Sequence, residues 1–426
     1  MEHDPIAACI TPWGHAAVAV VRVSGAGLRP LVERVAGPLP PARHARHVCL
    51  RDDEGPFDDG LVTYFPGPRS YTGEDVVEIS CHGNPLLVER LLRAIAARPA
   101  APGEFTRRAY LNGRMDLTRA EGVMATIAAT SRRGLDVARL GLGGAVAAEV
   151  EALRDALVDV GAELEAILDY PGEDLLFSDD RQLVGRLEGI AGRAGALAAS
   201  CRGGRVAVEG ARVVFAGPVN AGKSSLFNAL LGGPRAIVSS EPGTTRDVVE
   251  APWQLDSARL VLVDTAGERE SAGAVEAEGI ARGRAARDDA DLVVRCVPPG
   301  EVAPAASEDT LVVHTFADLG AGCPPGALAV SAHSGAGIAE LKSAILSRLG
   351  VDAPGNAAVV VHSARQAACF ARLGSLAREG ATALPEAGPA AAVERVYAAI
   401  EVLDEVVGGV REDVLDRLFA RFCVGK

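Results

Sequence analysis

The sequence predicts an architecture that combines an α/β part with an all-α part. Short apolar runs alternate with helical segments between about residues 210 and 350, which is the pattern of a sheet covered by helices. Helical spacing of apolar residues dominates on either side of this stretch. Because each flanking stretch has an apolar face that needs a partner, we expect one discontinuous helical domain that holds an inserted α/β domain. The expected segments are 1–116, 117–209, 210–352 and 353–426.

The first segment mixes both types of element and predicts an α+β domain. Runs of branched apolar residues predict strands at Ala16–Val23, Leu61–Tyr64 and Val76–Ser80. Leu28–Val35 and Pro85–Ala97 have the apolar spacing of amphipathic helices.

The other segments follow the same two patterns. Between residues 117 and 209 apolar residues recur at intervals of three and four, which predicts long helices. In the inserted segment, strands are expected at Val213–Phe215, Leu260–Val263, Leu292–Cys296, Leu311–His314 and Leu328–Ser331. Toward the end of the chain, helices are expected at Val393–Val407 and Val414–Phe422.

Charge and cysteine usage exclude several classes of protein. Lys and Arg total 43 against 56 Asp and Glu, so the net charge of −13 provides no overall basic field for nucleic acid or anionic membrane. The eight cysteines are scattered, which excludes a CxxC or zinc-knuckle motif and argues against a disulfide framework. With no basic amino-terminal region and no run of about 18 apolar residues, a cytoplasmic protein is expected.

Lysine is scarce in this chain. Only Lys223, Lys342 and Lys426 occur among the 43 basic residues. Since arginine is used wherever a cation suffices, each remaining lysine raises the question why a compact ammonium is needed at that position. Lys223 and Lys426 fall in the motifs described below, whereas Lys342, on an expected helix at Ala339–Leu349, is expected to be solvated.

The strongest motif is a phosphate-binding loop. Residues Gly217–Ser224 fit GxxxxGK[ST] and lie between a strand and the expected helix Ser225–Leu231, which is the context this motif requires. Its glycines let backbone N–H groups surround phosphates at a helix N-terminus. Lys223 is expected to reach the β- and γ-phosphates, and the Ser224 hydroxyl to bind Mg²⁺. The expected nucleotide contacts here are Asn220, Ala221, Gly222, Lys223, Ser224 and Ser225.

Two further motifs follow in the order expected of a GTPase. Asp264–Gly267 reads Asp-Thr-Ala-Gly after a strand, so its acid supports the Mg²⁺ shell and its glycine senses the γ-phosphate. The polar loop before it holds Gly243–Asp247, in which Thr245 is a second candidate ligand of Mg²⁺. The expected GTP contacts are Asp264, Thr265, Ala266 and Gly267, and from the loop Ser239, Ser240, Glu241, Pro242, Gly243, Thr244 and Thr245. Together these motifs predict a Ras-like P-loop GTPase domain.

The base-reading motif departs from the usual Asn-Lys-x-Asp. The chain has Thr315-Phe316-Ala317-Asp318, in which Asp318 keeps the carboxylate that accepts from guanine N1–H and the 2-amino group. Phe316 can cover the purine face, but Thr315 cannot bridge as asparagine does. Ser331-Ala332 fits the short backbone motif that reads guanine O6. We therefore expect GTP binding, at weakened affinity, through Thr315, Asp318, Ser331 and Ala332; hydrolysis of ATP as well as GTP would contradict this.

Two acids are candidates for orienting the attacking water. Glu268 follows directly after Gly267, where many small GTPases have glutamine, and it can equally be a solvated residue. Glu276 lies at the start of the next expected helix. The residues alone leave both open.

Several motifs together resemble the MnmE (TrmE) family, GTPases of tRNA wobble-uridine modification. They are Ser70–Glu78, Pro102–Thr106, Arg108–Leu117, Ala236–Asp247 and the terminal Cys423–Lys426. The resemblance extends from one end of the chain to the other.

This resemblance implies two ligand sites besides GTP and Mg²⁺. The N-terminal domain would bind formyl-tetrahydrofolate, with contacts at Arg22, Glu78, Arg114 and Lys426. A potassium ion would replace the arginine finger where two G domains meet, with ligands Asn220, Ser239, Glu241 and Thr244. Arg114 stands where the family commonly has lysine.

The resemblance also implies the catalytic groups and partners. It favours Glu276 over Glu268 as the water-orienting acid, and it makes Cys423 the candidate for the modification chemistry. The partner would be the FAD- and NADH-using MnmG subunit, and together they would add an aminomethyl or carboxymethylaminomethyl group to C5 of the tRNA wobble uridine. A homodimer through the N-terminal domain is implied as well. Since the chain is acidic, MnmG or a local arginine patch is expected to carry most of the tRNA contact.

Two alternatives stay open at this point. A ribosome-assembly GTPase of the Era or EngA kind would need a KH-like basic module after the G domain, where this chain has helices and a Cys-containing terminus. A nucleotide-binding switch without turnover would be compatible with the altered Thr315–Asp318 motif. Comparing GTP hydrolysis in K⁺ and Na⁺ tests the switch, and analysis of wobble uridines in a deletion strain tests the ribosomal alternative.

Overall fold

A computed structural model describes residues 4–170, 179–232, 249–265, 287, 289–305, 307–320, 324, 327–351 and 359–425. The chain forms two compact units, one of residues 1–120 with 404–426 and one of residues 121–403. Within the described helices, none combines the length and the apolar character needed to cross a membrane.

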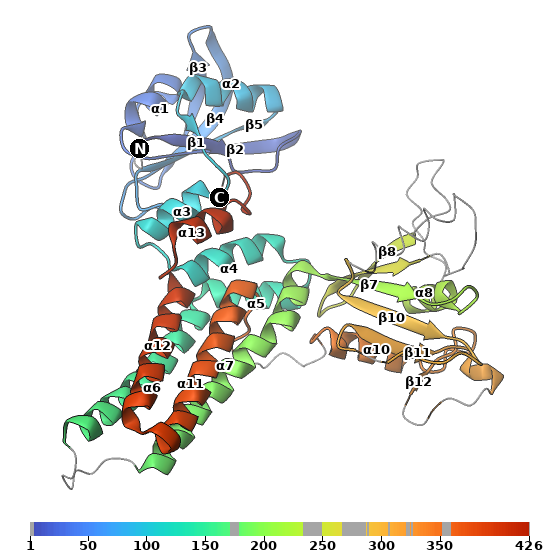
Figure 1. Ribbon diagram of the computed structural model, residues 1–426. Coiled ribbons are helices and arrows are strands. Elements are labelled where there is room, and N and C mark those ends of the chain that lie inside the picture. Colours follow the sequence, from blue (N-terminus) through green and yellow to red (C-terminus); the bar gives the residue numbers. More distant parts are fainter. Residues whose placement is uncertain are drawn as a thin grey trace. The chain divides into compact units, whose positions relative to one another are not determined.

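The first unit is built on a six-stranded sheet in the order β3-β4-β5-β2-β1-β6 (Figure 1). Its pairs are antiparallel except β1 with β6. The strands are β1 Ile6–Cys9, β2 Ala16–Ser24, β3 Ala45–Asp52, β4 Gly55–Phe65, β5 Val76–Gly83 and β6 Arg98–Pro99. The helices are α1 Leu28–Ala36, α2 Pro85–Ile95, α3 Glu104–Leu111 and, from the end of the chain, α13 Glu412–Phe419.

Apolar and polar side chains alternate along the strands, and the apolar face of the sheet is the one that the helices cover. Val21 and Val23 of β2 and Ile79 of β5 are fully buried in one apolar cluster with Leu28 of α1 and Leu91 of α2. The residues between them therefore point to the opposite face of the sheet. α2 starts where the Asn84 side chain accepts from the Leu86 N–H and Pro85 occupies the first turn.

The second unit combines long helices with another six-stranded sheet. The helices are α4 Leu117–Ala128, which begins in the first unit, α5 Arg132–Leu142, α6 Ala145–Asp169, α7 Asp180–Glu209, α11 Ala364–Ala387 and α12 Pro389–Val407, which ends in the first unit. α7 begins with a capping box, since Asp179 and Gln182 each accept from the other's backbone N–H.

The second sheet has the order β12-β11-β10-β7-β9-β8 and is parallel except for β8. Its elements are β7 Ala211–Ala216, α8 Lys223–Leu231, β8 Val249–Gln254, β9 Arg259–Asp264, β10 Leu292–Val297, β11 Thr310–His314, the 3₁₀ turn η1 Ala317–Leu319, β12 Leu328–Ala329 and α10 Ile338–Arg348. Its buried core includes Phe215, Leu226 and Ile345 from β7, α8 and α10. A single residue, Gly210, separates α7 from β7.

The expected fold class is confirmed. The sequence predicted no strand at β1, which lies between β2 and β6 in the first sheet, nor at β6, and the other differences concern edge strands and the ends of elements. The antiparallel edge strands β3 and β8 escaped prediction because polar residues or a proline interrupt their apolar pattern. β12 ends at Ala329, not Ser331, and α13 ends at Phe419, not Phe422. The segment boundaries drawn from the sequence stay predictions. Lys342 is exposed, and its Nζ also lies 5.8 Å from the ring centroid of Trp253.

Two glycines of α7 give opposite predictions. A Cβ on Gly203 would lie 2.2 Å from the Gly350 carbonyl oxygen, whereas one on Gly192 meets nothing within 4 Å. Gly192→Ala is therefore expected to stabilise the protein by about 0.5–1 kcal/mol. Gly203→Ala is expected to destabilise it, because two backbones must separate. Thermal unfolding of both variants checks this; a rise in Tm for Gly203→Ala would contradict the close packing.

Candidate functional site

The loop after β7 has the geometry of a phosphate cradle. Gly217 and Gly222 have φ angles of 149° and 84°, and a Cβ on Gly217 would lie 2.6 Å from the Cys296 carbonyl oxygen. Glycine is therefore required at residue 217 by both its φ and its packing. Asn220 also adopts a left-handed conformation, with φ 62°, at the exposed tip of the loop. The loop leads into α8, whose first backbone N–H groups have no partner within the helix.

Lys223 is held at the centre of this loop. It is only 5% exposed, and its Nζ donates to the carbonyl oxygens of Gly217 at 3.0 Å and Pro218 at 2.7 Å. The ammonium is therefore kept inside the cradle, on the loop that is built to surround phosphates.

Asp264 faces the beginning of α8 from the end of β9. Burial raises the pKa of its carboxyl, and the Ser224 hydroxyl and the Lys223 charge oppose this by stabilising the carboxylate. Its Oδ1 is buried and bonds no donor among the described residues. The neighbouring Thr265 hydroxyl donates to the Phe215 carbonyl oxygen at 2.7 Å, which ties the end of β9 to β7. An oxygen pair from Ser224 and Asp264 suits Mg²⁺, a hard cation that binds oxygen ligands and keeps several waters.

The base-reading residues lie beside this cradle. Thr315 is buried at the end of β11, and Asp318 is exposed on the turn that follows. A hydrogen bond from the Ser331 side chain lowers the pKa of Asp318, so the carboxylate stays ionised. Ser331 is 1% exposed, and the backbone N–H of the neighbouring Ala332 bonds no acceptor among the described residues. The structure thus places these residues close to one another, and their contact with guanine stays a prediction.

Several predicted residues lie outside the part of the chain that the structure describes. They are the loop residues Ser239, Ser240, Glu241, Pro242, Gly243, Thr244 and Thr245, the residues Ala266 and Gly267, both candidate acids Glu268 and Glu276, and Lys426. Of the expected K⁺ ligands only Asn220 is described, and of the Mg²⁺ ligands only Ser224.

A second polar site lies in the first unit, on the sheet face opposite α1 and α2. Arg22 of β2 pairs in register with Glu78 of β5, and its Nε and Nη2 donate to the same Oε1 at 3.0 and 2.8 Å. Arg22 is 8% exposed, and its buried Nη1 bonds no acceptor among the described residues. Its guanidinium lies 4.8 Å from the ring centroid of Tyr71 and 5.5 Å from that of Phe105. Arg114 donates to the carbonyl oxygen of Ser70, which precedes Tyr71.

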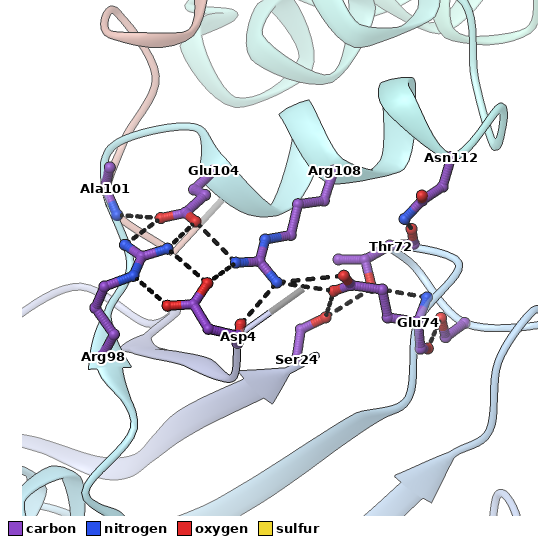
Figure 2. A network of polar contacts seen from close by, with 10 residues as sticks. Asp4, Ser24, Thr72, Glu74, Arg98, Ala101, Glu104, Arg108 and Asn112 are labelled. Carbon is purple, nitrogen blue, oxygen red and sulfur yellow. Dashed lines mark hydrogen bonds and ion pairs between the residues drawn. The ribbon is translucent and has the colours of Figure 1, made fainter. Parts of the chain in front are cut away.

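A network of hydrogen bonds and ion pairs joins α3 to the strands and loop beside it (Figure 2). Arg108 of α3 is 5% exposed and donates to Glu74, Glu104 and Asp4. Ser24 of β2 donates to Glu74 at 2.9 Å. Since α3 carries Phe105 and the loop before Glu74 carries Tyr71, this network fixes both rings against Arg22. Sequence reasoning missed both aromatic residues, although Tyr71 and Phe105 each lie inside a motif it had singled out.

The end of the chain packs against the same domain. The Gly103 N–H donates to the Cys423 carbonyl oxygen at 3.4 Å, and a Cβ on Gly425 would lie 2.7 Å from the Cys9 carbonyl oxygen. Because β1 ends at Cys9 and pairs with β2, the terminal motif lies at the edge of the strand pair that carries Arg22. The Cys423 side chain is exposed.

Exposure predicts which thiols react. Cys423 and Cys49 are exposed, whereas burial raises the pKa of Cys81 to about 11 and that of Cys296 to about 12. At pH 8 the two buried thiols are protonated and enclosed, so of these four thiols iodoacetamide is expected to label only the exposed pair quickly. Peptide mapping by mass spectrometry before and after unfolding checks this. Rapid labelling of Cys296 in the native protein would contradict its burial.

The geometry agrees with comparisons to known proteins. Residues 5–114 match the family described as GTP-binding protein TrmE N-terminus, and residues 117–423 match the MnmE helical domain. The chain belongs to the MnmE family. A tRNA modification GTPase MnmE of Akkermansia muciniphila is 41% identical over 99% of this chain and 98% of its own. The MnmE of Methylobacterium radiotolerans is 42% identical over the whole of both chains. The G domain of the T. maritima FeoB iron transporter is 25% identical over 32% of this chain and 98% of its own, with a TM-score of 0.26.

Family membership and the P-loop together make this chain a P-loop GTPase. The expectation of a GTP hydrolase is thereby confirmed.

Proposed function

We propose that this MnmE-family protein is a K⁺-dependent GTPase that acts on tRNA with a folate-derived one-carbon unit. With an FAD-containing subunit of the MnmG type, it would add an aminomethyl or carboxymethylaminomethyl group to C5 of the wobble uridine. The observation that carries the nucleotide half is the Lys223 ammonium held inside the cradle, with Ser224 and Asp264 beside it. Full-length similarity to tRNA modification GTPases supports the tRNA half.

In the GTPase step the chain's groups bind charge and position water. Lys223 and the loop N–H groups neutralise the phosphate oxygens, and Ser224 and Asp264 would hold Mg²⁺, which when bound would supply positive charge next to the phosphates. Asn220 is placed at the exposed loop tip, where its side-chain oxygen is available to a monovalent cation. Glu276, whose placement is outside the described residues, is the proposed group that orients water.

The K⁺ proposal predicts a cation-specific rate. GTP hydrolysis by the full-length protein is expected to rise by at least tenfold when Na⁺ is exchanged for K⁺ at constant ionic strength. Asn220→Ala should remove most of this difference, and Glu276→Ala should abolish hydrolysis while GTP still binds. Equal rates in both salts would reject K⁺ dependence, and GTP binding without turnover in either salt would favour a switch.

The folate proposal is supported by the site around Arg22. The carboxylate oxygen Oε2 of Glu78 bonds no donor among the described residues, and Glu78 is 30% exposed at its side chain. A carboxylate of this kind can accept two hydrogen bonds from the N–H edge of a pterin. The buried Nη1 of Arg22 offers a donor to the pterin carbonyl.

Binding of 5-formyl-tetrahydrofolate tests this site directly. Glu78→Gln is expected to weaken binding at least tenfold, because an amide replaces one acceptor by a donor. Glu54→Gln, an exposed acid of the same unit, serves as the matched control. Equal folate affinity of both variants would reject the site.

Cys423 is the proposed chemical group of the modification reaction. Its side chain is exposed, at a terminus that packs beside the strand pair carrying Arg22. Complementing a deletion strain with the Cys423→Ser variant, followed by nucleoside analysis of tRNA, tests the role. Normal wobble-uridine modification with normal GTP hydrolysis would exclude it. If the deletion strain itself kept its modified wobble uridines, the tRNA function would be rejected in favour of a role such as ribosome assembly.

A further inference from the structure

The base-reading loop of this chain differs from the common Asn-Lys-x-Asp at two adjacent positions. Thr315 and Phe316 stand where asparagine and lysine are usual, while Asp318 is kept. The structure describes all four residues of the loop, and three of their side chains bear on how a base would be bound.

The Thr315 side chain lies beside the phosphate cradle, with its Cβ 3.6 Å from the place a Cβ on Gly222 would take, but its hydroxyl is bonded within the protein. Its backbone N–H and its hydroxyl both donate to the carbonyl oxygen of Val297, at 3.0 and 3.3 Å. The residue is 6% exposed. A hydroxyl has a single proton, so this one is used within the loop, whereas an asparagine amide offers two N–H donors. The loop thus lacks the side-chain donor that serves purine N7.

Phe316 lies on the nucleotide side of the loop. It adopts a left-handed conformation, with φ 60°, which is unfavourable for a bulky residue. Two hydrogen bonds of the residues that follow hold it there. The Ala317 N–H donates to the Val330 carbonyl oxygen, and the Leu319 N–H donates to the carbonyl oxygen of Phe316. Its ring lies 3.5 Å from the place a Cβ on Gly222 would take, directly beside the phosphate cradle. The strained backbone therefore keeps an aromatic ring at the entrance to α8.

Asp318 supplies the remaining contact to the base edge. Asp318 is exposed, and a hydrogen bond from the buried Ser331 side chain lowers the pKa of its carboxyl, so the group is available as an ionised acceptor. As an ionised acceptor it pairs with two N–H donors side by side, which guanine presents at N1 and the 2-amino group. Hypoxanthine lacks one of these donors and adenine presents an acceptor at N1.

We propose that this site reads guanine by its ring face, through Phe316, and by its N1 and 2-amino edge, through Asp318, without any recognition of N7. The inference rests on the proposed GTP binding and refines its specificity. Replacing N7 of guanine by carbon should therefore not reduce the binding affinity at this site. Removing the 2-amino group should cost one charge-assisted hydrogen bond.

Competition binding with four nucleotides tests this on the full-length wild-type protein with Mg²⁺. 7-Deaza-GTP is expected to bind within about twofold of GTP, ITP at least tenfold more weakly, and ATP at least a hundredfold more weakly. A 7-deaza-GTP affinity tenfold or more below that of GTP would overturn the inference while leaving GTP binding intact. Equal affinity for ATP and GTP would instead reject the proposed GTP specificity itself.

Three variants separate the two contributions. Thr315→Asn introduces an amide donor and is expected to raise the affinity for GTP about fivefold without raising that for 7-deaza-GTP. Thr315→Ser keeps the bond to Val297 and should leave the affinities for the two nucleotides equal. Phe316→Ala is expected to weaken GTP and 7-deaza-GTP alike, by about tenfold, through lost stacking. Thermal unfolding confirms that each variant is folded. Unchanged GTP affinity in folded Phe316→Ala would overturn the role of the ring.

Discussion

Replacing Lys223 with alanine is expected to lower the rate of GTP hydrolysis by about 10²- to 10³-fold. The ammonium is buried in the P-loop and held on the Gly217 and Pro218 carbonyl oxygens, from which it can bind the β- and γ-phosphates. Those phosphate oxygens gain negative charge as the γ-phosphoryl group leaves, so a fixed positive charge stabilises the transition state. Single-turnover hydrolysis at saturating GTP measures the effect on the chemical step.

Lys342 provides a matched control for this prediction. Lys342→Ala also removes one ammonium from the same domain, and this one lies over the Trp253 ring at 5.8 Å. Its loss should lower stability by about 0.5–1 kcal/mol and leave the hydrolysis rate within twofold. Circular dichroism verifies that both variants are folded. Equal hydrolysis by Lys223→Ala and Lys342→Ala would contradict the P-loop assignment.

Replacing Glu121 with alanine is expected to destabilise the second unit by about 3–5 kcal/mol. Its side chain is 3% exposed and accepts from Ser363, Arg365 and Gln366, which lie at the start of α11. The carboxylate on α4 therefore anchors the start of α11. Its loss leaves a guanidinium that is only 16% exposed without this counter-charge. Urea unfolding followed at 222 nm measures the change.

The control for this prediction is an ion pair of similar length on the surface. Glu149 on α6 pairs with Arg193 on α7 at 2.8 Å, with 24% and 47% of the two side chains exposed. Glu149→Ala is expected to cost less than about 1 kcal/mol, because solvent already screens this pair. A loss of similar size in both variants would show that burial of the Glu121 pair does not determine its contribution.

Local patterns were sufficient for most central elements of both sheets. β2, β5, β7 and β10 are runs of branched apolar residues, buried by the core, so periodicity identified them. The edge strand β8 reads Val-Glu-Ala-Pro-Trp-Gln and pairs on only one side, so neither apolar content nor a full ladder marks it in the sequence. The P-loop was predictable because all its parts are contiguous in the chain.

The sequence alone determined the phosphate cradle and the altered base-reading motif, because each is a short contiguous pattern whose chemistry depends on residue type. It also showed that lysine is scarce in the whole chain, which drew attention to Lys223. Only the tertiary structure decided that Tyr71 and Phe105, 49 and 83 residues beyond Arg22 in the chain, enclose its guanidinium. It likewise decided that Glu121 anchors Arg365 and that the Thr315 hydroxyl is used by Val297. These contacts join residues far apart in sequence, and no local pattern records which partners the packing of sheets and helices brings together.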